Sequence, residues 1–71
     1  MSARLAITGK FIIRILLNHG FSIKRKRGSH VIMVHPDGRT TVIPVHAGET
    51  IGPGLFAKIL RDTDLPREAF R

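Results

Sequence analysis

The chain has 71 residues, no cysteine, and twelve Lys and Arg against five Asp and Glu, for a formal net charge of +7. A chain this short buries a single core, and the lack of cysteine excludes disulfides, thiolate nucleophiles and cysteine zinc sites. The excess of positive charge favours an anionic partner, and nucleic acid, an acidic membrane surface and an acidic protein are all open on this ground. A membrane-surface element needs a long basic amphipathic helix, and the sequence shows none.

The N-terminal sequence MSARLAITGK has no apolar stretch of signal-peptide length and no small-residue cleavage site. No apolar run approaches membrane-spanning length. We therefore expect a soluble, cytoplasmic protein that uses no membrane. Residues 1–8 have no role that the sequence assigns.

The first regular element is a helix predicted over residues 9–19. Thr8 can cap its N-terminus, and Gly20 stands where a helix usually stops. Apolar residues recur at helical spacing along one side, whereas Lys10 and Arg14 share the opposite side. This helix should pack one apolar face against a core.

Three strands should follow. Phe21 and Ile23 alternate with polar residues, which predicts a first strand with one wet face that Gly28-Ser29 interrupts. Residues 31–35 and 39–43 are rich in β-branched side chains and flank the turn sequence HPDG, so they should form a hairpin.

Pro44 should end the third strand, because proline cannot donate to a sheet ladder. Pro53 suits the first turn of a second helix that runs to Asp62, and Asp64 could cap a further helical turn in the tail. The order helix, three strands, helix predicts an α+β fold. It would be one domain over residues 1–71, with a core at about 9–62, a three-stranded antiparallel sheet and both helices on one face.

Seven cations are the candidates for contacts with RNA phosphates. They are Lys10, Arg14, Lys24, Arg25, Lys26, Arg27 and Arg39. Four adjacent cations at residues 24–27 would raise the local phosphate concentration and make binding fall with salt. The alternative is a solvated strand edge that discourages aggregation.

Four histidines, at positions 19, 30, 35 and 46, match no common zinc spacing, and we expect no metal site. If the hairpin pairs residues whose numbers sum to 74, His30 lies opposite Pro44 and His46 follows just beyond. Two imidazoles at one sheet corner would suit an acid and base pair. Ser29 and the local amides could donate to a phosphate oxygen.

The missing motifs narrow the reaction. The sequence has no GxSxG elbow for acyl transfer and no Walker loop for nucleotide hydrolysis. RNA brings its own nucleophile, the 2′-OH, so a protein needs only a base, an acid and positive charge near the phosphate. A lone histidine is more often a structural or surface residue than a catalyst. His30 stands just after the cation block, however, and we therefore expect it to be the catalytic residue of a ribonuclease that needs no metal and no small-molecule cofactor.

An ordered set of motifs resembles the HicA family of mRNA interferase toxins, also called YcfA-like. From about Lys10 to Phe70 the chain carries, in order, GF, GSH, HPDG, PVH, and GL before IL. The resemblance implies a fold similar to the double-stranded RNA-binding domain and cleavage of single-stranded mRNA that depends on the histidine of GSH, here His30. It also implies a toxin neutralised by a HicB-type antitoxin. A catalytic share for His46 goes beyond the family motif, and this residue could equally shape the loop before the second helix.

Three further questions are open at this point. The first is the orientation of the second strand. If Val31, Met33 and Ile43 face the helices, His30 lies on the open face beside Ile32 and Val42, which would form an apolar patch suited to an antitoxin. A bulge at Gly28-Ser29 would reverse this orientation. The rival function is a non-catalytic module that binds double-stranded RNA by shape. A third reading is an inactive relative that only binds a partner.

Overall fold

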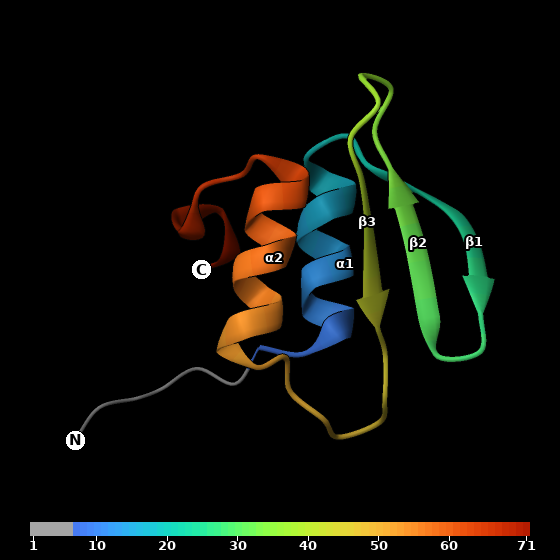
Figure 1. The fold of residues 1–71 in the computed structure, drawn as a ribbon, viewed down its shortest axis with the longest axis vertical. Coiled ribbons are helices and arrows are strands. Elements are labelled where there is room, and N and C mark those ends of the chain that lie inside the picture. Colours follow the sequence, from blue (N-terminus) through green and yellow to red (C-terminus); the bar gives the residue numbers. More distant parts are fainter. Residues whose placement is uncertain (1–6) are drawn as a thin grey trace.

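The computed structural model describes residues 7–71, so expectations that concern residues 1–6 lie outside the described part. The elements run α1 (Gly9–Asn18), β1 (Ser22–Arg27), β2 (His30–Val34), β3 (Thr40–Pro44), α2 (Pro53–Thr63) and a 3-10 turn η1 (Arg67–Phe70). The two helices lie side by side next to the sheet, whose strand order is β1-β2-β3 (Figure 1). This confirms the predicted α+β order. Within residues 7–71 no helix is long and apolar enough to cross a membrane.

Helix α1 begins and ends as its sequence predicts. The Thr8 hydroxyl accepts a hydrogen bond from the Phe11 N–H at 3.1 Å, a side-chain N-cap. At the other end Gly20 has φ 91°, its N–H donates to the Leu17 carbonyl, and the Phe21 N–H donates to the Leu16 carbonyl. This is a Schellman motif, and its left-handed position favours glycine.

The hairpin register is the expected one. His30 pairs with Pro44 and Val31 with Ile43, so the numbers of paired residues sum to 74. The strands cover 30–34 and 40–44, one residue away from the predicted 31–35 and 39–43. The shift arises because the hydrogen bonds of His35 belong to the turn: its N–H donates to the Arg39 carbonyl and its carbonyl accepts from the Gly38 N–H.

Strand β1 departs from simple alternation. Its register with β2 shifts between Ile23 and Arg25, which leaves Lys24 as the extra residue of a β-bulge. Phe21, just before the strand, is buried as expected, but Ile23 is 42% exposed. The helices pack mainly on β3, and β1 lies at the far edge of the sheet, so its inner face is only partly covered (Figure 1).

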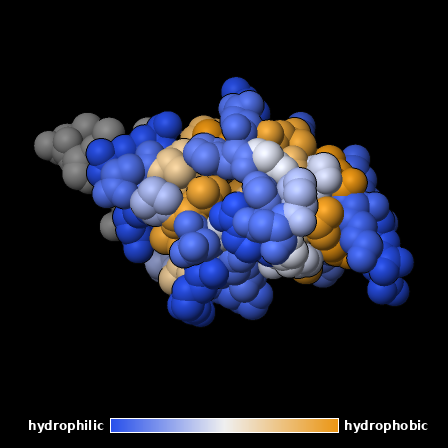
Figure 2. All heavy atoms as spheres, turned by 90° about the horizontal axis from the view of Figure 1, so that it is seen from above, coloured by the Kyte–Doolittle hydropathy of each residue, from blue (hydrophilic) through white to orange (hydrophobic). Residues whose placement is uncertain are grey.

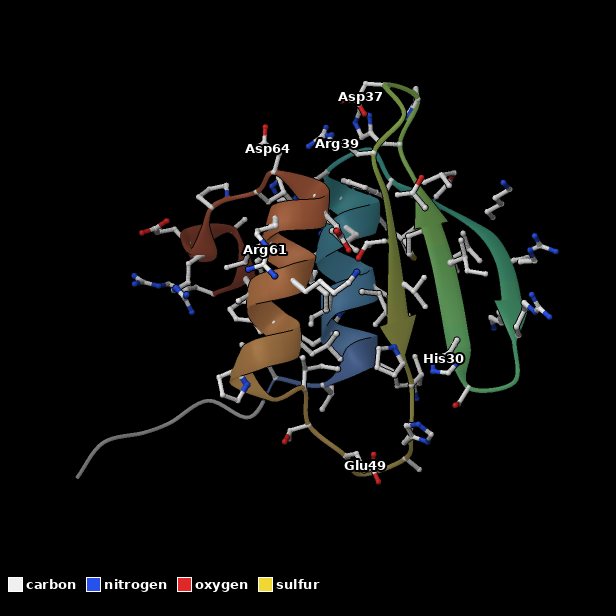
Figure 3. The ribbon with its side chains drawn as sticks, in the orientation of Figure 1. His30, Asp37, Arg39, Glu49, Arg61 and Asp64 are labelled. Atoms are coloured by element: carbon white, nitrogen blue, oxygen red, sulfur yellow. The ribbon has the colours of Figure 1, made fainter. Side chains whose placement is uncertain are left out.

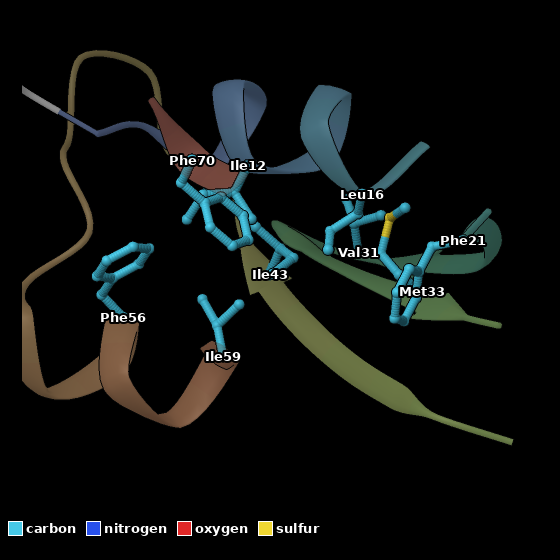
Figure 4. Close-up of a cluster of buried hydrophobic side chains, with 9 residues drawn as sticks. All are labelled: Ile12, Leu16, Phe21, Val31, Met33, Ile43, Phe56, Ile59 and Phe70. Atoms are coloured by element: carbon cyan, nitrogen blue, oxygen red, sulfur yellow. The ribbon is translucent and has the colours of Figure 1, made fainter. Parts of the chain in front are cut away.

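The core lies between the helices and the inner face of the sheet. Its buried side chains are Ile12, Leu16, Phe21, Val31, Met33, Ile43, Phe56, Ile59 and Phe70 (Figure 4). Because Val31, Met33 and Ile43 point into this core, the alternating residues of β2, including His30, face away from the helices. This confirms the first of the two orientations considered, since the bulge lies at Lys24 and not at Gly28-Ser29.

Helix α2 starts at Pro53, as predicted, and ends at Thr63, one residue past Asp62. The predicted role of Asp64 is wrong. Asp64 adopts a left-handed conformation with φ 56° and donates its N–H to the Leu60 carbonyl, so it terminates α2. The next turn begins after Pro66, whose fixed φ suits an extended lead-in, and Phe70 packs edge-on against Phe56 with ring centroids 5.4 Å apart.

Candidate active site

A tight turn fixes the position of His30. Gly28 and Ser29 are the two residues that connect β1 to β2, and Arg27 pairs with His30 across that turn. Gly28 has φ 57°, a conformation that a two-residue hairpin turn requires and that glycine adopts without strain. His30 is exposed at the end of β2 on the open face of the sheet (Figure 3). A polymer can therefore reach its imidazole.

Paired residues in an antiparallel sheet have side chains on the same face with Cβ atoms roughly 5 Å apart. His30 therefore lies between Arg27 on β1 and Pro44 on β3. The next row on this face consists of Arg25, Ile32 and Val42. The open face thus holds an exposed imidazole with two guanidinium groups on one side and a small aliphatic surface on the other.

Ser29 and His46 meet at the same end of the sheet. The Ser29 Oγ lies 3.3 Å from the His46 Nε2, within hydrogen-bond distance. The Val45 N–H also donates to the Ser29 carbonyl at 2.6 Å, which ties the chain after β3 to the turn. The structure therefore gathers the predicted catalytic residue and both candidate auxiliary residues, Ser29 and His46, in one region.

The bulge divides the cation block into two sets. Arg25 and Arg27 pair with Ile32 and His30, which places them on the open face. Lys26 pairs with the buried Val31 and so lies on the face that the helices cover, while Lys24 occupies the bulge. Residues 24–27 were predicted to act as one patch. Their side chains instead lie on two faces of the sheet, because one extra residue in a strand reverses the alternation of the residues that follow it.

Lys10 and Arg14 of α1 lie with Lys26 along a groove between α1 and β1. This groove is on the helix side of the sheet, whereas His30 faces the opposite side. Three of the seven predicted RNA contacts are therefore not on the face that presents the imidazole. They would meet a partner from another direction.

Arg39 lies at the opposite end of the sheet from His30 (Figure 3). Its Nε is 2.8 Å from the Asp37 Oδ2, its terminal nitrogen donates to the Thr63 carbonyl, and its guanidinium lies 5.1 Å from the Phe21 ring centroid. These bonds to Arg39 hold the pKa of Asp37 below its ordinary value. Arg39 thus joins the turn to α2 and is not part of the cluster around His30.

The other two histidines also lie apart from the site. His35 packs edge-on against Phe21 with ring centroids 5.0 Å apart, and its Nδ1 accepts the Asp37 N–H. The His19 Nδ1 is 2.9 Å from the Ile15 carbonyl on its own helix. Among residues 7–71, no three His, Asp or Glu side chains come close enough together to hold a metal ion.

Two features of the site were beyond sequence reasoning. The bulge at Lys24 has no composition signal, since it lies in an unbroken run of cations. The bond between Ser29 and His46 spans 17 positions and depends on the path of the loop after Pro44. For this contact the sequence offered one hint, since His46 was expected to lie close to the corner of the sheet.

Residues 9–65 match the family model described as the HicA toxin of bacterial toxin-antitoxin systems. Comparison with curated proteins gives no match. The matched range includes α1, the whole sheet, the Gly28–His30 turn and α2. The chain therefore belongs to the HicA toxin family of bacterial toxin–antitoxin systems.

Proposed function

We propose that this toxin is an endoribonuclease that cleaves single-stranded mRNA in the cytoplasm, with His30 as the catalytic base, and that a HicB-type antitoxin neutralises it. The observation that carries the proposal is the position of His30. It is exposed on the open face, it pairs with Arg27 across a two-residue turn, and Arg25 lies in the next row. An accessible proton acceptor beside positive charge is what cleavage of a phosphodiester requires.

In the proposed reaction the imidazole of His30 removes the proton from a ribose 2′-OH. The 2′ oxygen then bonds to the adjacent phosphorus, and the bond from phosphorus to the 5′ oxygen of the next nucleotide breaks. That leaving oxygen takes up one proton, for which His46 is our candidate donor. The products are a 2′,3′-cyclic phosphate on the 5′ fragment and a free 5′-OH on the other. The nucleophile comes from the RNA, so the protein needs neither a metal nor a cofactor for this step.

Arg25 and Arg27 would hold the scissile phosphate and stabilise the charge that develops on it. Guanidinium groups suit this role because they donate two parallel hydrogen bonds to phosphate oxygens. Within residues 7–71 neither arginine is engaged in a salt bridge, in contrast to Arg39. Ser29 supports the site through its contact with His46.

The rival function is a module that binds double-stranded RNA without cutting it. Such a module would benefit from cations at the N-terminus of its second helix to reach across a groove. Here α2 begins Pro53-Gly54-Leu55, and the Lys58 ammonium is bound to Asp62 at 2.8 Å. This arrangement gives the rival little support.

The decisive test compares the protein with its His30→Ala variant in EDTA, using a labelled single-stranded RNA to measure both cleavage and binding. We expect unchanged binding and a cleavage rate lower by a factor of about 100 to 10,000, the usual contribution of general acid–base catalysis. A cyclic phosphate on the 5′ fragment would identify the 2′-OH as the nucleophile. Loss of wild-type cleavage in EDTA would contradict the metal-free mechanism.

Two other outcomes would overturn the proposal. If both proteins cleave equally, His30 is not the catalyst. If neither cleaves but both bind, the binding-module reading replaces it. A matched His19→Ala variant, altered at a histidine far from the turn, should cleave like the wild type.

A further inference from the structure

The groove between α1 and β1 is lined mostly by residues that have no role in the proposed reaction, and only its Gly28-Ser29 end belongs to the turn before His30. It is a cavity of about 600 Å³ with an aliphatic floor, formed by Ile13, Leu17, Ile23, Val31 and Val45. Three large hydrophobic side chains among residues 7–71 are exposed, and two of them, Leu17 at 47% and Ile23 at 42%, line this groove. In Figure 2 a hydrophobic strip lies next to the hydrophilic rim at the right-hand end of the molecule, the end at which β1 lies in Figure 1.

The charges around the groove are all positive. Lys10 and Arg14 come from α1 and Lys26 from β1, and no Asp or Glu is among the described residues that line it. Lys26 reaches this side because the bulge at Lys24 reverses the alternation of β1. An aliphatic centre with a charged rim has the composition of a protein interface, and an exposed apolar patch marks an interaction site.

The lining favours a polypeptide over RNA. Proteins that hold unpaired bases stack them on aromatic rings or on guanidinium planes. The described lining has no aromatic residue, and its floor is made of branched aliphatic side chains. Leu17 and Ile23 can pack against the aliphatic side chains of an amphipathic segment. The three cations can form ion pairs with carboxylates on the same segment.

We propose that this groove docks an acidic amphipathic segment of the antitoxin that family membership implies. The inference rests on membership of a toxin–antitoxin family and is independent of RNA cleavage by His30. The groove opens on the helix side of the sheet, so the docked segment lies on the face opposite His30. Gly28 and Ser29, the turn that precedes His30, form one end of the groove, so an antitoxin anchored there reaches His30 around this turn or around the exposed β1 edge.

The competing location is the open face, where Val42 is 41% exposed and lies one row from His30. This residue provides a matched control, since its exposure is close to that of Ile23. We would measure the affinity of a purified HicB-type antitoxin for the full-length toxin without RNA. The variants are Leu17→Glu, Ile23→Glu and Val42→Glu.

We expect Leu17→Glu and Ile23→Glu each to weaken antitoxin binding at least about 30-fold, as for a residue at the centre of an interface. Val42→Glu should change the affinity less than about threefold.

Lys26→Glu should weaken binding more at low salt than at high salt, because the contact is electrostatic. Arg61→Glu, an exposed cation on α2 that does not line the groove, is its control.

Circular dichroism and thermal melting would show that each variant folds, and RNA binding would be measured in parallel. A larger loss for Val42→Glu than for the groove variants would locate the antitoxin on the open face and overturn the proposal. Unchanged antitoxin affinity in both groove variants would overturn it as well. If those variants lost RNA binding instead, the groove would be an RNA surface. Because the antitoxin assay contains no RNA, an inactive His30 would not alter its result.

Discussion

The two turns at the ends of β2 contain similar residues and differ in what those residues contact. At the Gly28-Ser29 turn, Arg27 pairs with an exposed His30. At the turn that follows β2, His35 and Arg39 are joined through backbone hydrogen bonds and both contact Asp37. Residues 22–46 contain one acid, Asp37, and it belongs to the second turn. The Asp37 carboxylate thus holds Arg39 in a structural contact. No carboxylate does the same for Arg27 at the other turn among the described residues, so its guanidinium is available to a partner.

The largest effect should come from removing the arginine of the second turn. Arg39→Met loses the bonds to Asp37 and the Thr63 carbonyl and the contact with Phe21. We expect a loss of about 2 kcal/mol in the free energy of unfolding, typical for a hydrogen bond to a charged group. For a domain of this size that lowers the melting temperature by roughly 8–16 °C, measured by circular dichroism.

The matched variant is Arg27→Met, which should change the free energy of unfolding by less than about 0.5 kcal/mol. It should nevertheless reduce RNA cleavage. Equal destabilisation by the two variants would show that the turns do not differ as described.

A smaller effect is expected from the histidines. His35→Ala removes the edge contact with Phe21 and the acceptor of the Asp37 N–H, and should cost about 1 kcal/mol. His30→Ala should leave unfolding in urea unchanged, because His30 is exposed and we find no side-chain hydrogen bond for it within residues 7–71. A destabilised His30→Ala variant would contradict this division of roles.

The smallest effect concerns acid. Hydrogen bonds from Arg39 hold the pKa of Asp37 below its ordinary value in the folded state, so its ionised form stabilises the fold at pH values above that ordinary value. This contribution is lost as the pH falls through the lowered value. The stability difference between wild type and Asp37→Asn should therefore shrink on acidification, by a small amount because the carboxylate is exposed.

Urea unfolding at several pH values would measure this change. The same pair of proteins compared in an Arg39→Met background should show a much weaker dependence on pH. If the dependence persisted there, another group would be its cause.

Most of the fold could be predicted because its signals are local. Thr8 caps α1, Gly20 ends it, and Pro53 opens α2, each through the conformational preference of one residue. The alternation of β2 made the open-face position of His30 one of the two orientations considered from the sequence, and the location of the bulge decided between them. The Asp64 prediction failed because a left-handed residue that ends one helix and a cap that begins the next look alike in sequence.

The sequence by itself determined the order of the elements, the register of the β2–β3 hairpin and the cationic character of the chain, since each depends on neighbouring residues. Only the tertiary structure decided where the cations point. The bulge at Lys24 sent Lys26 to a groove with Lys10 and Arg14, and Asp37 with the Thr63 carbonyl held Arg39 at the far turn. The physical reason is that a charge acts on what lies near it in space, and these neighbours come from segments that only folding brings together.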